Sequence, residues 1–309
     1  MRSSFFTVFV CTICCCSALP AQDKATRTGK GYPPQLEGAT VETYKTIGAG
    51  DEKVELKLWI YPAQNTKAAQ SEKTPTPAIV FFFGGGWKNG SPTQFERHCK
   101  HFAARGIVAV AADYRVASRQ DAKPAQCAAD AKSCVRWLRA NAARLNIDPQ
   151  RIVAAGGSAG GHLAAATATL PTLDEPTEDA KISSRPNALV LFNPALITAP
   201  FPGVDLSGFA SRATTAQLGA EPEAISPIHH VSQATPPTLI LHGRADTTVP
   251  YRTVEAFAAE MKKHGARCDL IGYEGAGHGF FNRDKYDDTL NAADAFLVSL
   301  DYLPAQPAR

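Results

Sequence analysis

Five short runs of almost uninterrupted apolar residues constrain the fold of this chain most strongly. They are PAIVFFF (77–83), IVAVAA (107–112), RIVAAGG (151–157), ALVLFNP (188–194) and PTLILHG (237–243). Strands that are apolar on both faces belong to parallel sheets that helices cover on either side. The segments between the runs repeat apolar residues at the 3.6-residue period of a helix. This alternation predicts an α/β fold with a mainly parallel central sheet and helices on both faces.

The chain of 309 residues is long enough for one large α/β domain. We expect that domain to cover residues 39–303, with a flexible leader at 22–38 and a tail at 304–309. Alternating apolar and polar residues between 44 and 62 predict an antiparallel hairpin at an edge of the sheet. Residues 195–235 are rich in Pro, Gly and Ser and lack a clear strand, so we expect a lid-like insertion there.

The first 21 residues have the pattern of a secretory signal peptide. Arg2 provides a short positive region, residues 5–16 are apolar, and small residues near Ala18 and Ala21 are typical of a cleavage site. The apolar run is too short to span a bilayer comfortably, so stable membrane insertion is not expected. The sequence therefore predicts cleavage of residues 1–21 and export.

Composition argues against several other classes of function. The formal net charge of +3 is small and the basic residues are spread out, so no nucleic-acid partner is expected. Four of the eight cysteines lie in the first 21 residues. The others are expected to be small apolar core residues: Cys99, Cys127, Cys134 and Cys268. Outside the predicted signal peptide no CxxC or Cys/His cluster has metal-ligand spacing, and we expect neither a metal nor another cofactor.

The segment RIVAAGGSAGGHLAAATATL (151–170) joins a predicted strand to an alanine-rich helix through glycines. Ser158 lies at the junction in the pattern G-x-S-x-G, the nucleophile elbow. Neighbours without side chains let strand and helix approach, while the strained turn presents the hydroxyl. The alternative is a dinucleotide-binding loop, which would open the first βαβ unit and precede an acidic residue by about twenty positions. This loop lies mid-chain, and no acidic residue follows it before Asp174.

A serine hydroxyl is a weak nucleophile, so it needs a base and a carboxylate that orients the base. Asp246 lies just past a buried strand in LILHGRADTTVP, and His278 lies in the glycine-flanked loop of LIGYEGAGHGFF. The order Ser158, Asp246, His278 is that of the α/β-hydrolases. Glu274 is a rival carboxylate, but it lies only four residues from His278 on the same loop. We therefore predict Ser158 as nucleophile, His278 as base and Asp246 as acid.

The other seven histidines have weaker claims to a catalytic role. Three on predicted helix surfaces are expected to be solvated: His98, His101 and His264. His162 is expected to pack or hydrogen-bond locally behind the serine, and His242 to support the turn that carries Asp246. Two lie in the predicted insertion, where they could contact substrate: His229 and His230.

The glycines of FFFGGGW (81–87) follow the strand that we expect beside the nucleophile strand. A tetrahedral intermediate carries an oxyanion, which preorganised N–H groups stabilise. The amides of Gly85 and Gly86, with that of Ala159 in the elbow, are therefore predicted to form an oxyanion hole. Trp87 is expected either to line the substrate pocket or to belong to the core. Asp113, at a strand end, is a weaker pocket candidate.

From about Tyr44 to Leu300 the chain resembles the α/β-hydrolase superfamily, in particular its esterase/lipase branch with hormone-sensitive-lipase-like and feruloyl-esterase-like members. The segments that carry the resemblance are FGGGW (83–87), ADYR (112–115), GGSAGGHLA (156–164), HGRADTTVP (242–250) and GHGF (277–280). The resemblance implies the α/β-hydrolase fold and the same triad and oxyanion-hole residues. Two positions depart from the family pattern: Phe83 replaces the usual His, and Gly157 stands where Asp or His is common.

The combined expectation is an exported serine carboxylesterase that acts through an acyl-enzyme intermediate without a cofactor. The resemblance suggests a small-molecule or carbohydrate ester as substrate, either an acetylated or feruloylated sugar or a short-chain acyl ester. Two alternatives stay open. HGRADTTVP also resembles the acid loop of prolyl-oligopeptidase-like enzymes, which indicates a peptidase or amidase on the same fold. A binding protein that kept the fold without catalysis is the other alternative.

Overall fold

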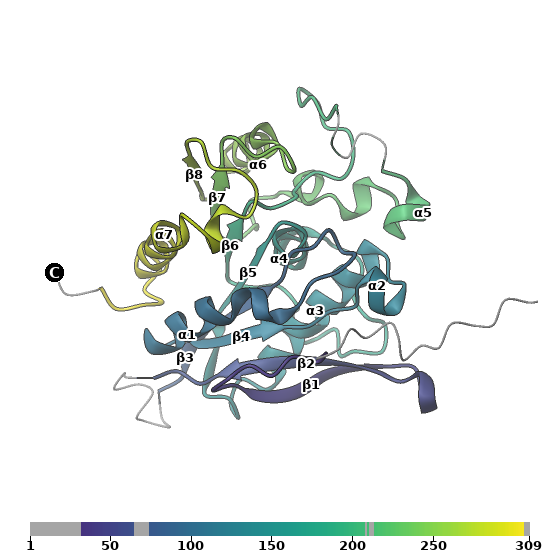
Figure 1. Ribbon diagram of the computed structural model, residues 1–309, viewed down its shortest axis with the longest axis vertical. Helices are drawn as coiled ribbons and strands as arrows, with labels where there is room; N and C mark the ends of the chain where they lie inside the picture. The colour runs from purple at the N-terminus through teal and green to yellow at the C-terminus, as the bar shows by residue number, and fades with distance from the viewer. Residues whose placement is uncertain (1–31, 65–73, 208, 210–212, 306–309) are drawn as a thin grey trace, which may run out of the picture.

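The structure is a computed structural model that describes residues 32–64, 74–207, 209 and 213–305. Its centre is one eight-stranded sheet with the strand order β1-β2-β4-β3-β5-β6-β7-β8 (Figure 1). The strands are β1 (Thr40–Ile47), β2 (Val54–Tyr61), β3 (Thr76–Phe82), β4 (Val108–Ala112), β5 (Ile147–Gly157), β6 (Ala188–Phe192), β7 (Thr238–Gly243) and β8 (Cys268–Tyr273). β2 pairs antiparallel with both β1 and β4, whereas all other neighbours are parallel. The predicted parallel sheet with an antiparallel hairpin at its edge is confirmed.

Helices connect and cover the strands. The α-helices are α1 (Glu96–Ala104), α2 (Ala117–Gln120), α3 (Pro124–Ala140), α4 (Ala159–Thr169), α5 (Thr215–Leu218), α6 (Tyr251–Lys263) and α7 (Tyr286–Val298). Short 3₁₀ helices are η2 (Gly50–Glu52), η3 (Pro92–Phe95), η4 (Glu223–Ile225), η5 (Pro227–His230) and η6 (Phe280–Asn282). In the part of the chain that the structure describes, no helix is long and apolar enough to cross a bilayer.

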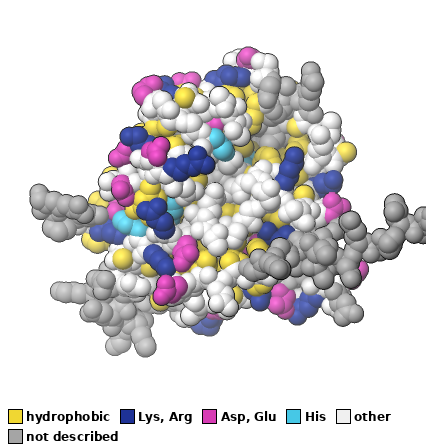
Figure 2. All heavy atoms as spheres, viewed as in Figure 1, with side chains coloured by type: hydrophobic (Ala, Val, Ile, Leu, Met, Phe, Trp, Pro, Cys, Tyr) yellow, Lys and Arg dark blue, Asp and Glu magenta, His cyan; other side chains and the backbone are white. Residues whose placement is uncertain are grey.

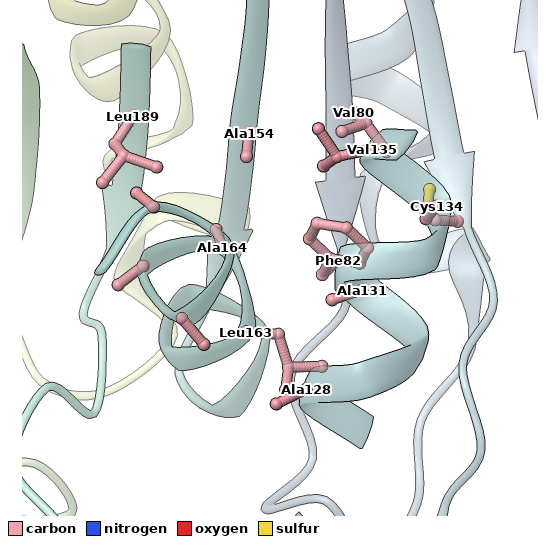
Figure 3. Close-up of a cluster of buried hydrophobic side chains, with 14 of the residues drawn as sticks. Val80, Phe82, Ala128, Ala131, Cys134, Val135, Ala154, Leu163, Ala164 and Leu189 are labelled. Carbon is pink, nitrogen blue, oxygen red and sulfur yellow. The ribbon is translucent and has the colours of Figure 1, made fainter. Parts of the chain in front are cut away.

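The apolar runs are explained by two cores, one on each face of the sheet. Successive β3 residues alternate between them: Val80 and Phe82 face the core under α3, α4 and α6, while Ile79 and Phe81 face the core under α1 and α7. Figure 3 shows buried side chains of the first core: Val80, Phe82, Ala128, Ala131, Cys134, Val135, Ala154, Leu163, Ala164 and Leu189. Many are small, which lets α3 and α4 pack close to the strands.

The predicted lid-like insertion, 195–235, connects β6 to β7. Its described residues form α5, η4 and η5 and no strand, and α5 lies at the periphery of the molecule (Figure 1). The predicted signal peptide (1–21), most of the predicted leader and most of the predicted tail lie outside the described residues.

The cysteines of the described residues are all free. Three are fully buried, as the sequence predicts: Cys99, Cys127 and Cys134. The fourth, Cys268, is half-buried at the start of β8.

The expectation that His98 is solvated is wrong. His98 is fully buried, because it lies on the same face of α1 as Cys99 and Phe102, which pack on the sheet. Its ring is surrounded by the aromatic rings of Phe81, Phe95, Phe192, Phe281 and Tyr286, with centroids 4.9–6.2 Å away. Among the described residues, neither ring nitrogen has a hydrogen-bond partner. Burial lowers the pKa of His98 to about 3, so its imidazole is neutral at neutral pH.

We predict that His98→Phe makes the free energy of unfolding less sensitive to acid. In the unfolded chain a histidine titrates near 6.5, whereas the pKa of folded His98 is about 3. Between these values only the unfolded state binds the proton, so His98 lowers stability as the pH falls. From pH 7 to pH 5 the variant should gain about 2 kcal/mol relative to the parent in denaturant unfolding.

The control for this prediction is Cys99→Ala, a buried substitution on the same helix that adds and removes no group titrating between pH 5 and 7. It should change the free energy of unfolding by the same amount at both pH values. If His98→Phe and the parent lose stability in parallel as the pH falls, the predicted cost of burying a neutral His98 is wrong.

Candidate active site

Ser158 lies at the one-residue junction between β5 and α4. Its backbone has φ 55° and ψ −118°, a region that a non-glycine residue occupies at a cost of about 1–3 kcal/mol. The flanking glycines are required by close contacts. A Cβ on Gly157 would lie 2.6 Å from the ring of Phe281. A Cβ on Gly160 would overlap the carbonyl oxygen of Phe82, so strand and helix can approach this closely only without side chains here.

Three side chains from distant parts of the sequence form one hydrogen-bonded chain. Nε2 of His278 lies 2.9 Å from Oγ of Ser158, and Nδ1 of His278 lies 2.7 Å from Oδ2 of Asp246. Ser158 follows β5, Asp246 follows β7 and His278 follows β8, so all three lie at the carboxyl ends of parallel strands. Open α/β sheets bind their ligands at this edge. The structure thus brings together the residues that the sequence predicts as nucleophile, base and acid.

The carboxylate of Asp246 is buried and fully hydrogen-bonded. Its Oδ1 accepts hydrogen bonds from the amides of Thr248 at 2.8 Å and Val249 at 2.9 Å. Burial by itself raises the pKa of Asp246, but the hydrogen bonds from His278 and the two amides outweigh it and hold the pKa below its ordinary value. His242 supports this turn, as predicted, because its Nε2 donates to the carbonyl oxygen of Val249 at 2.8 Å. Asp246 is therefore ionised at neutral pH and fixed against His278.

Glu274, the rival carboxylate, has a different partner. Its side chain is 83% exposed and forms an ion pair with Arg244, with 2.7 Å between Oε1 and Nε. Because the Nδ1 position of His278 is already taken by Asp246, Glu274 is left as a surface ion pair.

The glycine loop after β3 lies against Ser158, because β3 pairs with β5. A Cβ built on Gly84 would lie 3.3 Å from Cβ of Ser158. Gly85 and Gly86 have φ values of 127° and 62°, which favour glycine. Within the described residues, no acceptor is recorded for the amide N–H groups of Gly85, Gly86 and Ala159. These amides are therefore available to a negatively charged oxygen beside Ser158.

Two residues that hold the loops in place were missed by the sequence reasoning. Oε1 of Gln94 accepts from the amide of Gly84 at 2.6 Å and so anchors the glycine loop. Oδ1 of Asn193 accepts from the amide of Gly279 at 3.2 Å, next to His278. Asn193 did carry a signal, since it is a polar residue directly after the apolar run of β6, whereas no local pattern distinguishes Gln94.

Phe83, which replaces the family's usual His, holds the start of the glycine loop by stacking. Its ring packs on Tyr114 with centroids 4.1 Å apart, and the Tyr114 hydroxyl donates to the carbonyl oxygen of Phe83 at 2.7 Å. Asp113, the weaker pocket candidate, is buried and accepts from Arg119 at 2.9 Å. Burial raises the pKa of Asp113 to about 6, although Arg119 opposes the shift. Its contacts support the strand end rather than a pocket.

Trp87 directly follows the glycine loop and is half-buried. Its indole Nε1 donates to Nδ1 of His162 at 3.3 Å. The partners of His162 are thus distant in the sequence rather than local. In the insertion, His229 donates to the carbonyl oxygen of Pro200 at 3.1 Å, and His230 to that of Glu223 at 2.9 Å.

Two cavities border these elements. One of about 230 Å³ lies beside His278 and is lined by Glu274–His278, Phe280 and Arg283–Lys285. The other, of about 440 Å³, is larger but lies at the carboxyl end of α4, away from Ser158, with His230 in its lining. On the face shown in Figure 2, charged side chains are scattered over the left part and the edges, and an area near the centre is formed by backbone and uncharged side chains.

Comparison with known proteins identifies the family of this chain. The BD-FAE family model matches residues 66–261. The chain belongs to the BD-FAE family. Esterase LipC of Mycobacterium tuberculosis is 30% identical over 242 residues, which are 73% of this chain and 58% of LipC. The chain spans about half the length of the curated relatives it matches.

Solved structures similar to this BD-FAE chain include esterase 2 of Thermogutta terrifontis. Its propionate-bound form is 50% identical with a TM-score of 0.81, and the match covers 89% of this chain and 99% of that chain. The form phosphorylated by paraoxon is also 50% identical, with a TM-score of 0.79 and the same coverage. The α/β-hydrolase fold that the sequence predicts is therefore confirmed.

Proposed function

We propose that this chain is an exported serine carboxylesterase. The observation that carries the proposal is the hydrogen-bonded chain from Ser158 through His278 to Asp246, beside the glycine loop at Gly84. The names of its relatives support it, since LipC and the Thermogutta protein are both called esterases.

The geometry suits a two-step acyl transfer. Oγ of Ser158 attacks the ester carbonyl while Nε2 of His278 takes its proton, and Asp246 stabilises the imidazolium. The carbonyl oxygen becomes an oxyanion that accepts from the amides of Gly85, Gly86 and Ala159. His278 then gives the proton to the leaving alcohol, and an acyl-enzyme remains. Water, activated by the same imidazole, releases the acid and restores Ser158.

We propose short-chain acyl esters as the substrates. The support is the 50%-identical Thermogutta esterase 2, which has been solved with propionate and with butyrate bound. For the alcohol portion we propose a polar group, such as the sugar of an acetylated or feruloylated carbohydrate. The cavity of about 230 Å³ that His278 lines supports this, because Arg283, Asp284 and Lys285 also line it and give it charged walls.

Export is proposed from residues 1–21 alone, whose short positive region and apolar run are typical of a signal peptide. Protein recovered from outside the expressing cells should begin at Gln22 when its N-terminus is sequenced. Intact protein that stays inside the cells and begins at Met1 would contradict export.

The roles of the triad predict strong effects of single substitutions on p-nitrophenyl acetate hydrolysis. Ser158→Ala and His278→Ala should each lower kcat by about 10⁴-fold or more. Asp246→Asn should lower it by about 10⁴-fold, because the amide favours the wrong tautomer of His278. Circular dichroism should show that the variants stay folded.

The matched control is Glu274→Gln, which neutralises the rival carboxylate on the loop of His278. Its kcat should stay within about twofold of the parent. The assignment of Asp246 as the acid is wrong if Glu274→Gln loses most of its kcat while Asp246→Asn keeps a kcat close to that of the parent.

Substrate class is predicted to follow acyl length and bond type. For p-nitrophenyl esters, kcat/KM should be highest for acetate to butyrate and at least about tenfold lower for decanoate. The added methylenes of a decanoyl chain do not fit in a pocket sized for short acyl chains. An aminoacyl p-nitroanilide should be hydrolysed far more slowly than any of these esters. Faster anilide hydrolysis would support the peptidase alternative, and no hydrolysis of any ester would support the binding protein.

A further inference from the structure

The glycine loop that would hold the oxyanion has few contacts of its own. Gly84, Gly85 and Gly86 lack side chains, so backbone groups and the side chains of neighbours such as Gln94 and Trp87 hold the loop in place. The amides of Lys88 and Asn89 donate to the carbonyl oxygen of Gly85 at 3.1 and 3.2 Å, which closes the turn on itself. Trp87 has φ 59°, a strained conformation for a residue with a large side chain. Contacts of its side chain must therefore offset that strain.

Those contacts are made by His162, which is fully buried in the first turn of α4. The indole Nε1 of Trp87 lies 3.3 Å from Nδ1 of His162, and the two rings meet edge to face with centroids 5.1 Å apart. Nε2 of His162 lies 2.7 Å from the carbonyl oxygen of Ile225 in the insertion. One imidazole thus joins the glycine loop, the helix behind the nucleophile and the segment between β6 and β7.

The chemistry of the partners fixes the protonation of this imidazole. An indole nitrogen only donates and a carbonyl oxygen only accepts, so Nδ1 of His162 must be bare and Nε2 must carry the proton. Burial lowers the pKa of His162 to about 4, although the bond to Ile225 opposes the shift, so the ring stays neutral at neutral pH. A phenylalanine would fill the same space but could make neither hydrogen bond.

We propose that His162 is a positioning residue that aims the oxyanion-binding amides through Trp87 and ties them to the insertion at Ile225. The inference rests on the proposed esterase function. His162 is well placed for this role, because its own amide donates to the carbonyl oxygen of Ser158 at 3.0 Å. The nucleophile and the amides that must face the same carbonyl are therefore fixed by one residue. Errors of about 1 Å in such placement cost about 10²-fold in rate.

The test compares Trp87→Phe, His162→Phe and the double variant on a short-chain ester. Each single variant should lower kcat by about tenfold or more with KM within about threefold, because an oxyanion exists only in the transition state. The double variant should be no slower than the slower single variant, since both remove the same hydrogen bond. Inhibition by a trifluoromethyl ketone, which forms a tetrahedral adduct on the serine, should weaken by the factor lost in kcat/KM.

Trp59→Phe is the matched control, because it also removes a buried indole N–H, one that donates to the carbonyl oxygen of Pro34 at 3.1 Å. It should lower the melting temperature without changing kcat. If one test variant does not fold, the other still tests the inference, since each removes one partner of the hydrogen bond between Trp87 and His162. Folded variants with parental kcat and inhibitor affinity would overturn the inference while leaving the esterase proposal intact. An inactive parent would overturn both.

Discussion

The conformation of Ser158 is the constraint on which the rest of the structure depends. The chain must turn from β5 into α4 within one residue, and φ of 55° at a serine is tolerated only because the surroundings hold it there. Gly157 and Gly160 make this possible by leaving room for the Phe281 ring and the Phe82 carbonyl oxygen. The turn that costs stability is also what lifts the hydroxyl out of the core toward His278.

The parallel sheet supplies what that hydroxyl requires. Because β3, β5, β7 and β8 all end at one edge, loops far apart in the sequence meet there without any long excursion of the chain. The carboxylate of Asp246 remains an anion in a buried position, since two amides and His278 replace the water it has lost. Backbone amides thus stabilise the carboxylate of Asp246 at this edge, and under the proposed function those of the glycine loop would bind the oxyanion.

The sequence predicted the strands and the three residues of the hydrogen-bonded chain because these depend on local pattern. A β run before GGSAGG and polar residues after several of the apolar runs are visible without knowing any long-range contact. The errors and omissions are all long-range. His98 lies on a helix with both apolar and polar residues, and nothing in the sequence indicates the aromatic rings around it. The hydrogen bonds of Gln94 and His162 join segments whose separation along the chain has no characteristic value. A pattern of residues along the chain cannot show which polar groups are buried by distant segments.

The central claim is that Ser158 is the reactive nucleophile of this fold. Paraoxon transfers a diethylphosphoryl group to an activated serine, and the similar Thermogutta esterase 2 has been solved in its paraoxon-phosphorylated form. Mass spectrometry of the treated protein should find one such group, on the peptide that contains Ser158, with esterase activity lost in proportion to labelling. Labelling of a different residue, or full activity after complete labelling of Ser158, would contradict the claim.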